Sequence, residues 1–110
     1  MSVPNAKPEL PERRQTIRQA MLEQLARGPL TLRQLSTLLR QSEKELLPHL
    51  EHLQRSLRRE RGGRLQIEPA ECLGCGFRFE QRRRLSKPSA CPRCREQRIE
   101  PPRYWVGEHQ

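Results

Sequence analysis

Four cysteines provide the clearest chemistry in this 110-residue sequence. They form two C-x-x-C pairs, Cys72 with Cys75 and Cys91 with Cys94, and fifteen residues separate the pairs. Each pair can form a tight turn whose backbone N–H groups point at the thiolates, and two facing turns offer four sulfur ligands in a tetrahedron. Four protein ligands leave no open position for catalysis. The spacing therefore predicts one structural zinc ion held by Cys72, Cys75, Cys91 and Cys94.

Other uses of four cysteines compete with zinc. Iron can occupy the same four-thiolate cage. Disulfides are disfavoured, because the start of the chain lacks the basic and apolar regions of a secretory signal, and we expect a cytoplasmic protein in a reducing compartment. A redox C-x-x-C is disfavoured because neither pair lies in a thioredoxin-like strand–helix context. No apolar run approaches the roughly 18 residues that span a bilayer, so no membrane association is expected.

The segment around the cysteines is too short to fold on its own core. Residues 70–107 form the predicted zinc ribbon, and modules below roughly 40 residues usually need a metal or disulfides. Alternating side chains predict a strand at 77–81, followed by a loop at 85–90 and an extended tail from 97 to 106. All four aromatic side chains lie here, and we expect them to pack around the metal: Phe77, Phe79, Tyr104 and Trp105.

The preceding residues, 13–69, have the periodicity of three short helices. Residues 1–12, rich in proline, are expected to form a flexible arm. The first helix is expected to begin at Arg13 and to stop at Gly28 and Pro29. Capping boxes predict the second helix from Thr31 and the third from Ser42 to about Arg59.

Two local features follow from proline and glycine. Pro48 lies beyond the first turn of the third helix, so the sequence predicts a kink there or a regular helix that starts at Pro48. Gly62 and Gly63 predict a turn before a short strand at 64–68, which Pro69 ends.

Six segments are distinctive: Thr31-Leu-Arg-Gln-Leu-Ser36, Gln41-Ser-Glu-Lys-Glu45, Leu50-Glu-His-Leu53, Glu68-Pro-Ala-Glu-Cys72, Lys87-Pro-Ser-Ala-Cys-Pro-x-Cys94 and Ile99-Glu-Pro-Pro-Arg103. Together they resemble a family of predicted transcriptional regulators in which a winged helix-turn-helix is fused to a zinc ribbon. The resemblance covers residues 13 to 106. It implies an α+β fold, with a winged helix-turn-helix over 13–69 and a four-cysteine zinc ribbon over 70–107, and a DNA-binding role. The sequence departs from the usual motif at Arg40, Gln41, Pro48 and His49.

The charge favours a polyanionic partner, and we expect double-stranded DNA. The net charge is +9, and arginine supplies most of the basic residues. Residues 55–64 and 82–84 are the most basic segments, suited to phosphate contacts. The predicted nucleic-acid contacts are Arg33, Gln34, Lys44, Arg55, Arg58, Arg59, Arg61, Arg64, Arg82, Arg83 and Arg84.

Two alternative functions stay open. Residues 43–54 carry three glutamates and one lysine, which would repel phosphates and suit a protein partner, as in an interaction adaptor. The ribbon and its arginines could instead bind RNA or the ribosome. A homodimer through the first helix is compatible with the sequence. No nucleophile–base pair and no aspartate is present, so we expect a protein that is not an enzyme.

Overall fold

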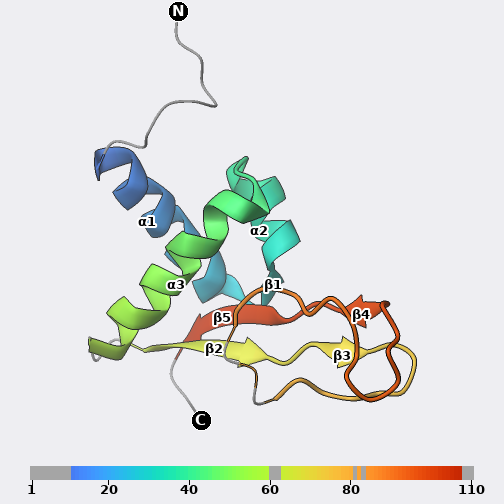
Figure 1. Ribbon diagram of the computed structural model, residues 1–110. Coiled ribbons are helices and arrows are strands. Elements are labelled where there is room, and N and C mark those ends of the chain that lie inside the picture. The colour runs from blue at the N-terminus through green and yellow to red at the C-terminus, as the bar shows by residue number, and fades with distance from the viewer. Residues whose placement is uncertain (1–10, 60–62, 81, 83, 108–110) are drawn as a thin grey trace, which may run out of the picture.

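The computed structural model describes residues 11–59, 63–80, 82 and 84–107. Three helices lie over one face of a small antiparallel sheet, and the cysteine segment extends from one end of that sheet (Figure 1). The helices are α1 (Pro11–Arg27), α2 (Leu32–Leu39) and α3 (Glu43–Arg59). The strands are β1 (Leu30–Thr31), β2 (Arg64–Glu68), β3 (Glu71–Cys72), β4 (Ile99–Glu100) and β5 (Arg103–Gly107). The predicted α+β class with three helices is confirmed.

Capping interactions set the start of α2 and α3. The Thr31 hydroxyl accepts from the Gln34 N–H at 3.1 Å, and the Gln34 side chain accepts from the Thr31 N–H at 2.8 Å. Ser42 and Glu45 repeat this exchange, at 3.0 and 3.1 Å. Both predicted capping boxes are therefore present. The Ser42 N–H and hydroxyl also lower the pKa of the Glu45 carboxyl.

Two helix details differ from the sequence expectation, and a third shows how a departure from the usual motif is accommodated. The first helix starts at Pro11, two residues before Arg13, because proline is well suited to a first helical turn. The third helix runs through Pro48 as one element, so the predicted start at Pro48 is wrong. Arg40, which stands where glycine is common, caps α2 in the left-handed conformation with φ 56°.

One antiparallel ladder joins the helical region to the cysteine segment. The larger sheet has the order β1-β5-β2, with β5 between the other two strands. Glu68 pairs with Arg103 at the end of β2 and β5, and Glu71 pairs with Glu100 in β3 and β4. Two residues separate Glu68 from Glu71, and two separate Glu100 from Arg103. The β3–β4 pair therefore continues the register of the β2–β5 pair after a break of two residues in each strand.

Prolines explain the break in this ladder. Pro69, Pro101 and Pro102 occupy it, and proline has no N–H to donate. Arg103 spans the gap, because its guanidinium lies 3.2 Å from the Glu68 carboxylate and 3.4 Å from that of Glu100. The cysteine segment is thus the long connection, residues 69–102, between two paired strands of the helical region.

The main core lies between the helices and the sheet. Its buried members are Ile17, Met21, Leu25, Leu35, Leu46, Leu50, Leu53, Leu57, Leu85 and Tyr104. Leu85 comes from the connection, and the Tyr104 hydroxyl donates to its carbonyl. Burial raises the pKa of Tyr104 to about 12. The expectation that Tyr104 packs at the metal is wrong, because β5 carries it into the helical core.

A second, smaller core supports the cysteines. It contains Ala70, Cys72, Cys91 and Ile99, with Phe77 and Phe79 packed against it. The ring centroids of Phe77 and Phe79 lie 5.0 Å apart in an edge-to-face arrangement. Two of the four aromatic side chains that were predicted to pack around the metal therefore do so. The predicted strand at 77–81 reduces to a single bridge between Arg78 and Glu71.

His49, a polar residue where the usual motif has an apolar one, is buried. Its side chain is only 4% exposed and accepts a hydrogen bond from the Arg18 guanidinium at 3.1 Å. The departure from the usual apolar residue at this position is therefore accommodated by a polar partner on α1.

In the part of the chain that the structure describes, no helix combines the length and the apolar character that crossing a bilayer requires.

Candidate metal centre

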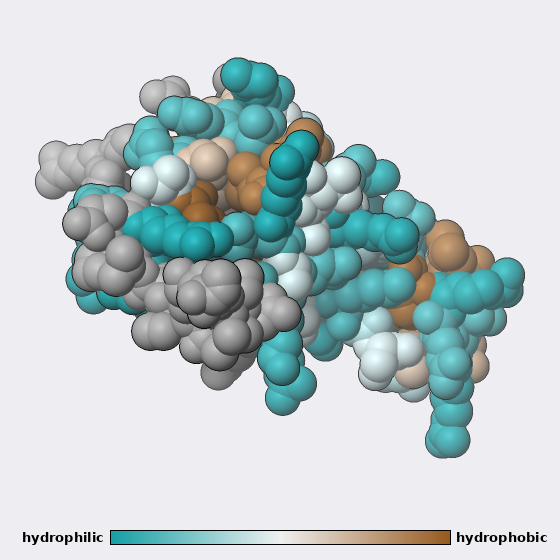
Figure 2. Space-filling view, turned by 90° about the horizontal axis from the view of Figure 1, so that it is seen from above, coloured by the Kyte–Doolittle hydropathy of each residue, from teal (hydrophilic) through white to brown (hydrophobic). Residues whose placement is uncertain are grey.

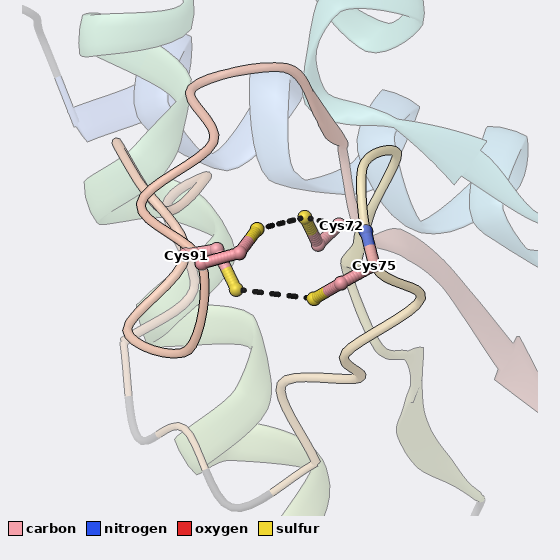
Figure 3. Close-up of side chains that lie close together, drawn as sticks. Cys72, Cys75 and Cys91 are labelled. Atoms are coloured by element: carbon pink, nitrogen blue, oxygen red, sulfur yellow. Dashed lines mark hydrogen bonds between the residues drawn. The ribbon is translucent and has the colours of Figure 1, made fainter.

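The four cysteine sulfurs converge between two loops (Figure 3). Cys72 Sγ lies 3.5 Å from Cys94 Sγ, and Cys75 Sγ lies 3.7 Å from Cys91 Sγ. All four sulfurs lie within 4.8 Å of one another. A zinc tetrahedron with bonds of about 2.3 Å has sulfur–sulfur edges of about 3.8 Å, so the thiols fit this metal. No cysteine here forms a disulfide.

Backbone N–H groups of both turns point at the thiols. The N–H groups of Gly74 and Cys75 donate to Cys72 Sγ at 3.2 and 3.4 Å. In the second turn, the Arg93 N–H donates to Cys91 Sγ at 3.3 Å. Such donors stabilise thiolate charge and orient the sulfur toward the metal. The two C-x-x-C turns thus have the local geometry that their spacing predicted.

The two turns also support each other. The Leu73 N–H donates to the Arg98 carbonyl at 3.0 Å, which links the first turn to the strand after the second. Glu96 packs over Gly74, where an added Cβ would lie 3.1 Å from the Glu96 Cγ. A larger residue at this position would require Glu96 to shift by a few tenths of an ångström.

The surroundings of Cys91 and Cys94 shift the pKa values of their thiols in opposite directions. Burial favours the neutral Cys91 thiol, but N–H groups of Cys94 and Arg93, with the thiols of Cys75 and Cys72, lower its pKa to about 7. The Glu96 N–H favours the Cys94 thiolate, but the Cys72 thiol and burial outweigh it and raise the pKa of Cys94 to about 12. Four neighbouring thiolates would repel one another, so the four thiols cannot all ionise without a cation. Metal binding must therefore displace protons from them.

Cationic side chains surround this negative centre. Zinc with four thiolates carries a net charge of −2, and Arg93, Arg95 and Arg98 lie in or after the second turn. The Arg98 guanidinium lies 2.9 Å from Glu96, and Glu96 first, then the Cys72 thiolate, raises the pKa of Arg98. No sequence pattern assigned Arg98 a role, since its pairing depends on the folded turn.

An asymmetry between the turns makes Arg95 a strained position. Gly76 and Arg95 follow the second cysteine of their pairs, and both have left-handed backbone, with φ 80° and 67°. Glycine adopts this conformation freely, whereas a side chain costs roughly 1–2 kcal/mol.

We therefore expect Arg95→Gly to stabilise the zinc-loaded protein by about 0.5–1 kcal/mol, since the relief of strain exceeds the entropy that glycine adds to the unfolded chain. Thermal unfolding measures the change. Arg95→Lys, which keeps the charge and the strain, is the control and should leave stability unchanged. A fall in stability for Arg95→Gly alone would show that the arginine side chain matters more than its backbone.

The predicted nucleic-acid residues come from several elements of the fold. Gln34 is occupied by its capping box, whereas Arg33 lies exposed at the start of α2. Lys44 is exposed on the first turn of α3, between Glu43 and Glu45. Arg61 and Arg83 lie outside the described residues. The rest form two groups, one at the end of α3 and the start of β2 and one in the cysteine segment: Arg55, Arg58, Arg59 and Arg64, then Arg82 and Arg84.

Two family models match this chain. The model described as PF0610-like, N-terminal, matches residues 16–65. The PF0610 rubredoxin-like zinc beta-ribbon domain matches residues 69–109. Together with the convergent sulfurs, the second match identifies residues 69–109 as a zinc ribbon with one structural zinc, held by Cys72, Cys75, Cys91 and Cys94.

A solved structure is similar over nearly the whole chain. It is the solution NMR structure of protein PF0610 from Pyrococcus furiosus, with 29% sequence identity and a TM-score of 0.73. The similarity covers 94% of this chain and 100% of that chain. A search of curated protein sequences gave no match. The helical region and the ribbon therefore occur together in a known protein fold.

Proposed function

We propose that this protein binds double-stranded DNA as a winged helix-turn-helix protein and acts in transcriptional regulation, a binding role rather than a catalytic one. One observation carries the proposal. Arg55, Arg58, Arg59 and Arg64 lie exposed together, and none has an ion pair with a residue that the structure describes. Arginines without such an ion pair among the described residues are available to phosphate oxygens.

The contacts around Arg58 and Arg64 suit a phosphate group. These two arginines line a shallow cleft between α3 and β2, together with Gln54, Leu65 and Gln66. The glutamine amides add neutral hydrogen-bond donors beside two positive charges. No acidic side chain lines this cleft among the described residues. A DNA backbone lying along it would be held mainly by charge and by hydrogen bonds to phosphate.

A neighbouring cleft on α3 is also positive. His52, Arg55, Ser56 and Arg59 line it. The pKa of His52 is lowered, first by burial and then by the positive charges of Arg18 and Arg55. A protonated histidine is disfavoured where the potential is already positive. The same potential would attract a polyanion to this part of α3.

The topology supports the winged-helix interpretation. α3 follows α2 after a short turn, and the β2–β5 pair follows α3, which is the order of a recognition helix and its wing. In this interpretation β2 and β5 are the strands of the wing, and the zinc ribbon lies in the connection between them, residues 69–102. Glu43, Glu45 and Glu51 would repel DNA at the amino half of α3. We therefore propose that contacts concentrate at its carboxyl half and that phosphates contribute more than bases.

Duplex binding tests this proposal. Arg58→Gln with Arg64→Gln is expected to weaken binding to a random pool of short duplexes roughly tenfold per arginine, because each substitution removes a charge-assisted hydrogen bond. The slope of log affinity against log salt should become shallower by about 0.9 for each phosphate that the variant no longer neutralises. Fluorescence anisotropy at several salt concentrations measures both quantities.

The matched control places the same two substitutions on α1. Arg13 and Arg27 are exposed there, and Arg13→Gln with Arg27→Gln changes the net charge equally. Equal losses of affinity for both double variants would mean that net charge alone drives binding and would overturn the proposed site. Sequence enrichment from the pool would support a regulator that selects its DNA sites.

A protein-interaction adaptor is the second candidate function. Leu38 is 51% exposed on α2 and precedes the acidic start of α3, so an apolar side chain lies near three glutamates in sequence. This pattern suits a basic partner with an apolar anchor. No duplex binding by the zinc-loaded protein would favour this function.

A further inference from the structure

A groove on the zinc ribbon has no part in holding the metal or in the proposed duplex contacts. Its walls include Phe77, Phe79, Arg82, Ala90 and Pro92. Both rings are half-buried, since one side packs on the small core around Cys72 while the remainder faces the groove. Figure 2 shows the ribbon as a smaller lobe on which hydrophobic atoms lie among hydrophilic side chains.

The charge at this groove is positive. The Arg82 guanidinium donates to the Ser86 carbonyl at 3.2 Å and to its hydroxyl at 3.5 Å, and both partners are neutral. Glu80 also lines the groove, but Arg78 offsets it, with 3.1 Å between Nε and the carboxylate. Arg84 and Arg93 are exposed nearby in sequence and have no ion pair with a described residue.

Aromatic walls beside arginines that have no ion pair with a described residue match the chemistry of one class of ligand. Unpaired bases stack on aromatic rings, while the phosphates between them contact cationic side chains. Duplex bases cannot stack in this way, because their faces already lie against neighbouring bases. A purely acidic peptide would use the arginines but would leave the rings without a partner.

We propose that this groove binds single-stranded nucleic acid, with unpaired bases against Phe77 and Phe79 and a phosphate at Arg82. The site is separate from the α3–β2 cleft of the proposed function and does not depend on it. The ribbon would then contact a melted or single-stranded segment while the helical region contacts a duplex.

Anisotropy with labelled twelve-residue probes, oligo(dT) and oligo(U), tests the proposal on the zinc-loaded protein. Phe77→Leu with Phe79→Leu keeps the apolar character but removes the aromatic faces, and we expect about tenfold weaker binding to the single strands. Zinc stoichiometry checks that the ribbon stays intact. Duplex affinity should not change in this variant, whereas Arg58→Gln with Arg64→Gln should weaken duplex binding and leave the single strands bound.

A second variant keeps the proposal falsifiable if the phenylalanine variant loses zinc. Arg82→Gln leaves both rings in place and should lower the salt slope by about 0.7, the value for one phosphate contact on a single strand. An unchanged slope, or equal affinity for a twelve-residue polyglutamate peptide, would overturn the proposal. A preference between oligo(dT) and oligo(U) would support it and show that the groove responds to the thymine methyl group or to the 2′-hydroxyl.

Discussion

Zinc removal is expected to unfold the ribbon and to weaken the sheet of the helical region. Around the cysteines, the small core has four buried members among the described residues, so the metal supplies most of the stability of the ribbon. Structural zinc contributes roughly 10–16 kcal/mol in isolated zinc-finger peptides, far more than such a core can replace. Cys91→Ser should have the same effect as a chelator, because it removes a buried ligand.

The loss of structure should extend beyond the ribbon because β2 and β5 are joined through it. With the metal bound, β3 and β4 continue the β2–β5 ladder in the same register. Without it, residues 69–102 become an open connection, whose closure costs about 2 kcal/mol more than a four-residue turn. The central strand of the sheet, β5, is therefore expected to lose stability together with the metal site.

Heteronuclear NMR measures both parts of this prediction. In chelator, amide signals of Cys72 and Ile99 should collapse to unfolded positions, while those of α1 and α3 stay dispersed. Thermal unfolding of the remaining helical region should occur at a lower temperature. Ser89→Ala, an exposed change in the same segment, serves as the control. Dispersed ribbon signals in chelator would contradict the prediction and would show that the peptide alone determines the ribbon fold.

Leu85→Ala should destabilise the helical region, although Leu85 belongs to the ribbon segment. The side chain is only 4% exposed and packs in the same core as Met21, Leu50 and Tyr104. Removing three buried carbons and leaving a cavity costs roughly 2–5 kcal/mol. Urea unfolding followed by helical circular dichroism measures the change in the free energy of unfolding.

Leu73→Ala provides a matched control for this substitution. Leu73 lies in the same ribbon but is 59% exposed, so the change should stay within about 0.5 kcal/mol. Tyr104→Phe tests the accompanying hydrogen bond, because it leaves the buried Leu85 carbonyl without its donor, at a cost of about 1–3 kcal/mol. An effect of Leu85→Ala as small as that of Leu73→Ala would show that the loop does not anchor the ribbon.

Sequence patterns over short distances predicted much of this protein. The spacing of Cys72, Cys75, Cys91 and Cys94 determined the metal ligands, because each pair lies within one turn of backbone. The capping boxes at Thr31 and Ser42 located two helix starts, since each involves residues three apart. The nucleic-acid contacts stay predictions, and Gln34 shows the difficulty, because its side chain is already used within the helix cap.

Only the tertiary structure decided where Leu85, His49 and Tyr104 lie and how the ribbon joins the sheet. Nothing local distinguishes the buried Leu85 from the exposed Leu73, because each is a leucine in a polar segment. The pairing of Glu68 with Arg103 joins residues 35 positions apart. Such contacts are selected by the packing of a shared core and by the metal between the strands. The sequence by itself therefore determined the ligands and the helix starts, whereas long-range packing decided the strand register and the attachment of the ribbon to the helices.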